Sequence, residues 1–477
     1  MDLEASMAEL SAAAKTIQID AAPLPVGALG TVGAALVNRS IFAPVAPDAR
    51  AALLAAVDSC ESARYRRCCG AILGMAVGDA VGAPLEFMEA GSGVAAFDPD
   101  TASYGGEQAP RNMFDFKPGQ WTDDTSMGLC LADSLLAAAA SQQREGALFS
   151  GSDFVARLWN WNCQGLNNSF RHDAERLGDE ATRAFMAEAG LDASASLQSL
   201  GCGKGMRRML EGLVEGEEPP DAQPSGSDDA VYEGNAVLIR LAPVPVLCCL
   251  SRSPEACMSM ARASAASTQN GPAAATAAAF LAFTMHRAMR RGAASTESVQ
   301  AFLDVAADDF TALLLQRREG GDEPEPEPEQ AQEWIRTHRE AEDLVLRLLR
   351  SSELPDSCEV CWNWRSSGHD VTAAIANRGE MYNGHPVSRE YFGAYALDGL
   401  AIALWAVYHS NSATAAIAKA ANVLGDADST ACIAGQLAGS FYGDASIDRR
   451  LLDMLRVWDP DREIEMRAAL LFCAGQA

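Results

Sequence analysis

Residues 74–82, with the sequence GMAVGDAVG, place a glycine at every fourth position. At this spacing the three glycines lie on one stripe of a helix. Residues 435–443, GQLAGSFYG, repeat the spacing much later in the chain. Because glycine has no side chain, such a stripe lets another helix approach closely. We therefore expect both segments to be helical, with their glycines serving packing rather than chemistry.

The rest of the sequence also favours helices. Hydrophobic residues make up 48% of the 477 positions and aromatic residues only 7%. The apolar residues are mainly alanine and leucine, which are strong helix formers. Few segments alternate as a half-buried strand would, so the sequence predicts an all-α fold. Helical patterns cover 126–140, 153–162, 174–189, 203–212, 255–266, 272–290, 297–318, 331–351, 391–409, 412–423 and 431–441.

One large domain with extensions fits this length. Residues 1–60, rich in Ala, Pro and Gly, are expected to form a partly disordered N-terminal extension with one candidate helix. The domain is expected to span 61–445, and 446–477 to form a C-terminal helical segment. Two acidic insertions, near 215–229 and 319–332, are expected to loop out of the domain. The second alternates Glu and Pro, and fixed proline φ angles with charge repulsion resist compaction.

The charge and the cysteines limit the partners and the compartment. Acidic residues outnumber basic ones by 64 to 37, and the formal charge is −27. A field of this sign disfavours nucleic acid and anionic membranes, so we expect neither partner. We also expect the protein to be a monomer. The 13 cysteines complete no zinc motif and are expected to be reduced and mostly buried. The acidic N-terminus lacks a signal peptide pattern, which favours a cytoplasmic protein and leaves organelle targeting open.

Two short segments carry more acid than a helix start requires. Residues 122–125 read TDDT and precede an apolar helix, and residues 425–430 read GDADST before a second one. Capping explains one Asp or hydroxyl residue at such a position, but not two carboxylates with two hydroxyls. The positive end of a helix offsets clustered negative charge only in part. If the two segments meet, their four carboxylates will need cations.

The ligand type selects the metal. Ligands that are all oxygen suit Mg²⁺, Mn²⁺ or Ca²⁺ rather than zinc or copper. An EF-hand loop beginning at Asp426 would need Gly at Ala431 and Glu at Leu437. A phosphate-binding P-loop is also ruled out, because Lys204 is followed by Gly205 rather than by Ser or Thr.

Two further segments are candidate parts of a site. In residues 78–87, GDAVGAPLEF, Pro84 ends the helix near Ala83, which leaves Glu86 in the following turn. Taken alone, Glu86 is equally typical of a surface acid. Residues 232–237, YEGNAV, form a glycine-containing turn before an apolar segment. Such a turn can bind phosphate through free backbone N–H groups, although ordinary surface turns share this composition.

Together and in this order, these segments resemble the ADP-ribosylglycohydrolase family, which includes dinitrogenase reductase-activating glycohydrolases and eukaryotic ADP-ribosylhydrolases. The resemblance covers about residues 64–445. It implies a compact, single-domain all-α fold with a dinuclear Mg²⁺ or Mn²⁺ centre. It rests on 78–87, 122–125, 234–243, 394–405 and 425–429.

The resemblance also implies roles for individual residues. Metal ligands would be Thr122, Asp123, Asp124, Asp426, Asp428 and Ser429. The catalytic group would be Glu86, together with Asp123, Asp124 and Asp428. Contacts to the ADP-ribose phosphates would come from Tyr232, Gly234, Asn235 and Ala236.

The implied reaction is hydrolysis of the glycosidic bond at C1″ of ADP-ribose, in an ADP-ribosylated protein or a small ADP-ribose conjugate. Two metal ions would hold the ribose hydroxyls and a water molecule and polarise both. Glu86 would assist as general base or gate. The leaving group stays open among arginine, serine and acetate. The alternative is a non-catalytic member that binds ADP-ribose or serves structurally, as some lens crystallins resemble this family; the intact acidic segments favour the enzyme.

We predict that the acidic insertion 319–332 is dispensable for folding. Its alternating Pro and Glu cannot contribute to a hydrophobic core, so a protein that lacks it is expected to stay soluble and to melt in one cooperative transition. Solubility and thermal melting of the deletion protein test this. Loss of both properties would contradict the prediction.

Overall fold

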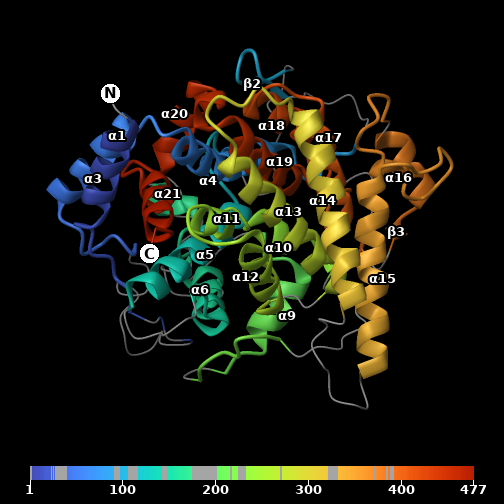
Figure 1. Ribbon diagram of the computed structural model, residues 1–477, viewed down its shortest axis with the longest axis horizontal. Coiled ribbons are helices and arrows are strands. Elements are labelled where there is room, and N and C mark those ends of the chain that lie inside the picture. The colour runs from blue at the N-terminus through green and yellow to red at the C-terminus, as the bar shows by residue number, and fades with distance from the viewer. Residues whose placement is uncertain are drawn as a thin grey trace, which may run out of the picture.

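The structure is built almost entirely of helices (Figure 1). It is a computed structural model that describes residues 3–22, 24, 26, 40–90, 97–105, 116–141, 148–173, 201–214, 217–223, 233–268, 271–320, 331–369, 371–382, 385–386 and 391–476. The α-helices are α1 (Leu3–Ala14), α3 (Pro47–Ser59), α4 (Ala63–Gly82), α5 (Asp123–Ala140), α6 (Gly151–Gln164), α9 (Lys204–Glu211), α10 (Ala236–Ile239), α11 (Pro243–Cys248), α12 (Pro254–Ala266), α13 (Pro272–Arg290), α14 (Val299–Gly320), α15 (Ala331–Arg350), α16 (Val371–Arg378), α17 (Ala396–Tyr408), α18 (Ala413–Ala421), α19 (Ala427–Tyr442), α20 (Arg449–Trp458) and α21 (Glu463–Ala474).

The remaining regular elements are short. The 3₁₀ helices are η2 (Ala83–Leu85), η3 (Ser169–His172), η6 (Val360–Trp362) and η7 (Asp444–Ser446). Two antiparallel strand pairs complete the set: β1 (Phe97–Asp98) with β2 (Ser103–Tyr104), and β3 (Met381–Tyr382) with β4 (His385–Pro386). The all-α fold expected from the sequence is therefore confirmed.

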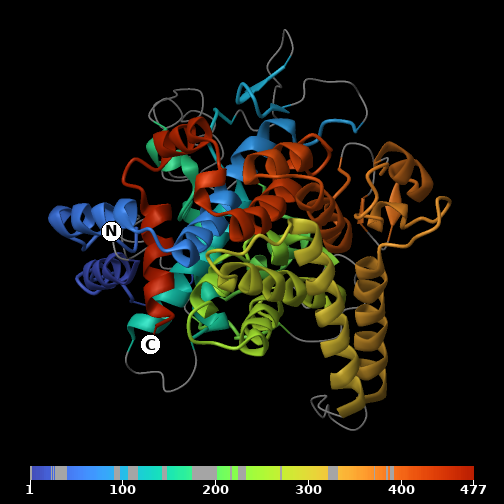
Figure 2. The same cartoon turned by 45° about the horizontal axis from the view of Figure 1, so that its top comes forward.

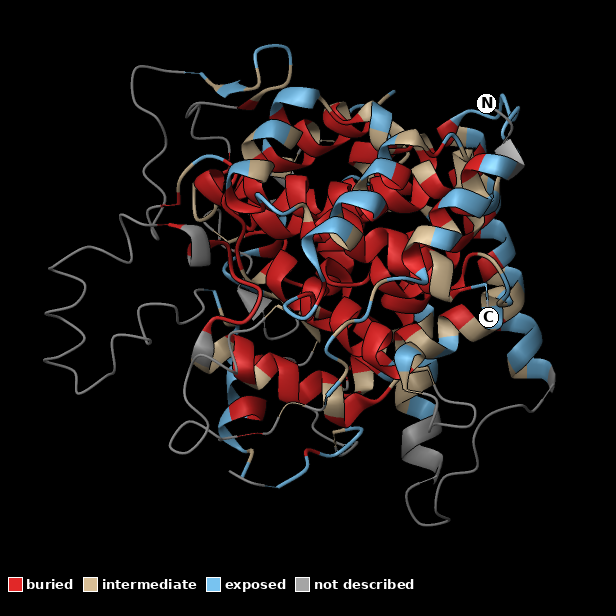
Figure 3. Ribbon diagram, turned by 90° about the vertical axis from the view of Figure 1, so that its left-hand side faces the viewer, coloured by how far each residue is buried: buried red, intermediate tan, exposed pale blue. Residues whose placement is uncertain are grey.

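The two glycine stripes pack directly against each other at the α4–α19 contact. A β-carbon on Gly74 would lie 2.1 Å from the carbonyl oxygen of Gly435, and one on Gly78 would lie 2.2 Å from that of Ala431. No side chain fits such a gap, so the two backbones touch over three turns. The end of α4 meets the start of α19, which makes the pair antiparallel. Both helices are almost wholly buried, and buried residues fill the interior of the molecule (Figure 3).

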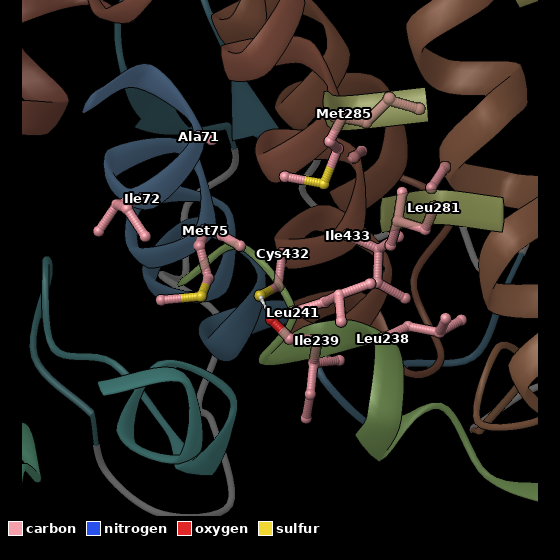
Figure 4. Packing of buried hydrophobic residues seen from close by; sticks show 14 of the residues in the cluster. Ala71, Ile72, Met75, Leu238, Ile239, Leu241, Leu281, Met285, Cys432 and Ile433 are labelled. Carbon is pink, nitrogen blue, oxygen red and sulfur yellow. Dashed lines mark hydrogen bonds between the residues drawn. The ribbon is translucent and has the colours of Figure 1, made fainter. Parts of the chain in front are cut away.

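Other buried helices surround this pair. Figure 4 shows Met75 of α4 near Cys432 of α19, with Ile239 and Leu241 of the α10 segment beside them and Leu281 of α13 in the same cluster. The Cys432 thiol donates to the carbonyl oxygen of Ile239 at 3.2 Å. Burial of these apolar side chains provides the main favourable contribution to folding.

The chain termini join the same core. Leu10 of α1 and Leu53 of α3 belong to one hydrophobic cluster with Leu471 of α21. Helix α21 is also tied to α5 by a fully buried ion pair, in which Arg467 Nε lies 2.7 Å from Asp133 Oδ1. On the other side of the molecule, α14 and α15 form a long antiparallel pair (Figure 2).

Most helices predicted from the sequence are present within two or three residues of their expected bounds. Helix α17 is shorter than the predicted 391–409, because residues 391–395 form a turn that bridges to Gly234. Helix α19 begins four residues before the predicted 431, so its acidic segment lies inside the first turn. The predicted helix 174–189 lies outside the described residues.

Parts of the N-terminal extension and of the two acidic insertions lie within the described residues. Residues 1–60 contain two helices, α1 and α3, where the sequence predicted one. Part of the 215–229 insertion packs on α6, since Asp221 Oδ1 accepts a hydrogen bond of 2.9 Å from the Ser152 backbone N–H. The Glu-Pro repeat of the 319–332 insertion lies outside the described residues.

The cysteines match their expected state. All 13 cysteines are free, and most are buried. In the part of the chain that the structure describes, one helical stretch, Ala63–Leu85, is long and apolar enough to cross a membrane, and its apolar window is fully buried inside the protein.

We predict that Gly435→Ala destabilises the protein by about 1–3 kcal/mol or more, because the new β-carbon would lie 2.0 Å from the Gly74 carbonyl oxygen, a backbone atom that cannot rotate away. Urea denaturation measures the free energy of unfolding. The matched control is Gly203→Ala, whose β-carbon would meet no atom within 4 Å. Equal unfolding free energies for the two variants would contradict the close contact.

Candidate metal centre

Glu86 reaches the site through a turn at the end of α4. Pro84 stops the α-helix, and the 3₁₀ turn η2 carries the chain to Glu86 in an extended conformation. The next residue, Phe87, has a φ of +62°, and its N–H donates to the Gly425 carbonyl oxygen at 2.8 Å. Gly425 in turn donates to the Met88 carbonyl oxygen at 3.0 Å. These two backbone hydrogen bonds hold Glu86 beside the acidic start of α19.

The start of α5 is held by Asp79 of α4. Asp79 is fully buried, and its carboxylate accepts hydrogen bonds from Thr122 N at 3.0 Å, Thr125 N at 2.8 Å and Thr125 Oγ1 at 2.6 Å. Thr122 is the N-cap of α5 and accepts from Asp124 N at 3.3 Å. Asp79 therefore fixes the backbone that carries Asp123 and Asp124. Asp79 lies in the glycine-rich stretch 74–82, and no role was predicted for it from the sequence.

The two acidic segments meet, although about 300 residues separate them. Thr122 Oγ1 donates to Asp428 Oδ2 at 3.3 Å, and Ser429 Oγ donates to Asp124 Oδ1 at 3.4 Å. Each segment thus places a hydroxyl on a carboxylate of the other. All four side chains are buried.

Glu86 completes the cluster from a third element. Ligand atoms of Glu86, Asp426 and Asp428 all lie within 4.8 Å of one another. Asp123 is partly exposed, and its carboxylate lies against Gly201, where a β-carbon would meet Asp123 Oδ1 at 2.0 Å. The predicted ligands and the predicted catalytic glutamate therefore lie in one region. They come from the turn after α4, the start of α5 and the start of α19.

Burial and mutual proximity raise the pKa values of these acids. Burial raises the pKa of Asp428 to about 8, and the charge of Asp426 adds to the effect. Burial raises the pKa of Asp426 to about 6, with a hydrogen bond from Asn235 opposing it. Burial, followed by the charge of Asp428, also raises the pKa values of Glu86, Asp123 and Asp124. The cluster therefore disfavours its own ionised form unless positive charge is supplied.

The donor set fits a hard divalent cation. Its ligands are carboxylate and hydroxyl oxygens only, the set that Mg²⁺, Mn²⁺ and Ca²⁺ prefer. Asp124 Oδ2 is buried and has no hydrogen-bond partner among the described residues. A buried carboxylate oxygen without a donor is costly, and a bound cation would satisfy it.

The glycine turn lies at the edge of the same cluster. Asn235 Nδ2 donates to Asp426 Oδ2 at 2.6 Å, and its backbone N–H donates to the Ala394 carbonyl oxygen at 3.0 Å. Gly234 pairs with Tyr395 in an isolated β-bridge, and Ala236 begins α10. Tyr232 lies outside the described residues. The Asn235 side chain is thus directed at a predicted metal ligand.

Tyr391 is a neighbour of the cluster that was not predicted from the sequence. The charge of Asp426, with burial, raises the pKa of its hydroxyl. Its ring stacks on Phe87 with a centroid distance of 5.1 Å and an interplanar angle of 7°. This aromatic pair covers the turn that carries Glu86.

Comparisons with known proteins show which family this chain resembles. A family model described as ADP-ribosylglycohydrolase matches residues 61–474. A Pseudomonas putida (strain GB-1) protein named ADP-ribosylarginine hydrolase Tri1 is 28% identical over 375 residues, which are 78% of this chain and 70% of that protein. A Serratia proteamaculans (strain 568) protein of the same name is 24% identical over 395 residues, 83% of this chain and 76% of that protein.

Two further matches carry related descriptions. A Rhodospirillum rubrum protein named ADP-ribosyl-[dinitrogen reductase] glycohydrolase is 32% identical over 160 residues, which are 34% of this chain and 48% of that protein. A solved structure described as an ADP-ribosylglycohydrolase-related protein complex is 25% identical, covers 86% of this chain and 98% of that one, and has a TM-score of 0.47. The family match over most of the chain confirms the expected resemblance: the chain belongs to the ADP-ribosylglycohydrolase family and is a glycosyl hydrolase.

Proposed function

We propose that this protein is a metal-dependent hydrolase that cleaves the glycosidic bond at C1″ of ADP-ribose on ADP-ribosylated protein. The convergence of Glu86, Asp426 and Asp428 within 4.8 Å carries the proposal. A buried cluster of this kind without cations would oppose folding, whereas with two Mg²⁺ or Mn²⁺ ions it becomes a Lewis-acid centre.

The residues that would hold the ions are those that meet across the two acidic segments. They are Thr122, Asp123, Asp124, Asp426, Asp428 and Ser429. When bound, the ions would supply positive charge for ribose hydroxyls and for water. Asn235 would orient the Asp426 carboxylate. Its amide donates to Oδ2, and the other carboxylate oxygen would be left to bind an ion.

Glu86 is proposed as the group that handles the proton. It is the one predicted acid placed on a turn rather than in a helix start, and it is only partly buried. A carboxylate there would accept a proton from the attacking water and would lie on the substrate side of the ligands. Phe87 and Tyr391 would limit access of bulk water to this turn.

We propose arginine-linked ADP-ribose as the substrate. Two relatives that align with more than three quarters of this chain are named ADP-ribosylarginine hydrolases, and the Rhodospirillum relative is named for ADP-ribosylated dinitrogen reductase. A protein modified on arginine is therefore the first substrate to test, with serine-linked and O-acetyl conjugates as comparisons. Gly234 and Ala236 remain proposed contacts for the phosphates, because their turn adjoins Asp426.

We predict that Asp123→Ala and Asp428→Ala each lower turnover at least about 100-fold, because each removes a proposed ligand from the cluster. The assay is release of ADP-ribose from an arginine-modified protein, with Mg²⁺ or with chelator. Asp453→Ala is the matched control, since Asp453 is 56% exposed and lies on α20. Circular dichroism and thermal melting check that both variants fold. Full activity of either variant at limiting Mg²⁺ would exclude the dinuclear assignment.

We also predict that metal binding raises the melting temperature. A ligand that binds only the folded state stabilises it by about 2.7 kcal/mol at a hundredfold excess over its dissociation constant. Melting is measured with chelator, Mg²⁺, Mn²⁺ and Ca²⁺, and again with Asp426→Asn. Identical melting of the natural protein in all four conditions would contradict a shared metal site.

The same measurement has a predicted pH dependence. The raised pKa values mean that the folded, metal-free protein holds protons that the unfolded chain has released. In chelator, stability should therefore be highest near the ordinary carboxylate pKa of about 4 and fall as the pH rises towards about 8. Saturating Mg²⁺ should reduce this loss. A chelated protein whose stability rises over that interval would contradict the clustering of the carboxylates.

A further inference from the structure

A positively charged pocket lies at the far end of α19 from the acidic cluster. Its lining residues come from the start of α12, the end of α13 and the start of α14, and its volume is about 410 Å³. Arg291 links it to α19, because its guanidinium lies 3.8 Å from the ring centroid of Phe441. At a rise of about 1.5 Å per residue, Phe441 lies roughly 20 Å along α19 from Asp428. The titratable groups of its lining are Arg252, His286, Arg287, Arg290, Arg291 and Glu297.

In the part of the chain that the structure describes, two of the four guanidinium groups have no carboxylate partner. Arg287 pairs with Asp309, and Arg291 Nε lies 3.3 Å from Glu297 Oε2. Arg290 donates only to backbone carbonyls, at 3.0 Å and 3.2 Å. Within the described residues Arg252 makes no side-chain hydrogen bond or ion pair, and its Nε is buried.

A fifth guanidinium group and a buried histidine lie beside the four arginines of the pocket. Arg67 of α4 donates to the carbonyl oxygens of Arg291 and Gly292, and after burial the charge of Arg291 is the largest influence lowering its pKa. Burial and then the charge of Arg290 lower the pKa of His286, which is 1% exposed. The guanidinium groups repel one another in a protein whose net charge is −27. Their partners within the protein are mainly backbone carbonyls and two carboxylates, which leaves positive charge that an anion bound in the pocket would offset.

The chemistry of the pocket selects the anion. Guanidinium groups match phosphate oxygens in geometry and charge, and can donate two hydrogen bonds to one phosphate. A volume of about 410 Å³ exceeds what a single inorganic ion fills and lies within the usual range for small-molecule pockets. Phe302 and the 45%-exposed Val305 form an apolar wall beside the arginines. We propose that this pocket binds a phosphate-bearing small molecule, at a site separate from the metal centre.

Inorganic pyrophosphate is the probe for this site. It is titrated calorimetrically into metal-free protein at constant ionic strength, because in chelator the acidic cluster repels anions and cannot contribute. We expect one saturable site. Arg252→Gln should weaken binding at least tenfold without unfolding the protein, since the Arg252 side chain makes no hydrogen bond or ion pair with the described residues. Glu297→Gln should tighten binding at least threefold, because it removes the carboxylate that pairs with Arg291 Nε.

The matched control removes one positive charge elsewhere. Arg449→Gln acts on a side chain that is 76% exposed and pairs with Asp453 on α20. It should leave pyrophosphate affinity unchanged. The proposal is overturned if the natural protein shows no saturable binding, if Arg252→Gln and Arg449→Gln bind equally, or if a short oligoglutamate peptide binds more tightly than pyrophosphate. None of these outcomes bears on ADP-ribose release, so the pocket and the proposed hydrolase activity are tested separately.

Discussion

The backbone contact between α4 and α19 is the constraint on which the rest of the structure depends. With glycine or alanine at each crossing point, the helices approach until carbonyl oxygens of one lie where β-carbons of the other would be. The end of α4 then lies beside the start of α19. Glu86 leaves one helix end and Asp426 begins the other, so this close helix packing also sets the distance between two parts of the proposed centre.

The acidic cluster is held by hydrogen bonds that oppose its repulsion. Asp79 accepts three hydrogen bonds from the first turn of α5, and Asn235 donates one to Asp426. These contacts fix the backbone and the carboxylate orientations before any cation arrives. Preorganisation of this kind matters because a centre that must close around its ions loses binding energy to ordering. The remaining charge, with Asp124 Oδ2 unsatisfied, is what a divalent cation would offset.

Charge is distributed unevenly along the molecule. Helix α19 has the carboxylates at its first turn and the arginine pocket beside its last turn. A protein with a net charge of −27 repels phosphate-bearing molecules from most of its surface, so both regions need a local source of positive charge to hold one. In the pocket the arginines supply it; in the acidic cluster bound metal would.

The sequence by itself determined the helices and the residue types of the centre. Apolar periodicity and capping depend on neighbouring residues, so α5, α12, α13 and α18 could be predicted closely, and two acidic helix starts indicated oxygen ligands for a hard cation. The predicted start of α17 at residue 391 was wrong, because residues 391–395 form a turn with a bridge to Gly234 that no local pattern encodes.

Only the tertiary structure decided which of these segments touch. The glycine stripes could have packed on any helix, and the role of Asp79 depends on α5 lying beside α4. Arg252, before α12, and Arg290, at the end of α13, line the same pocket. The net charge of −27 did not predict a positively charged site. Secondary structure follows from interactions within a few residues, whereas a site assembled from distant segments follows from how their surfaces fit, which the chain acquires only on folding.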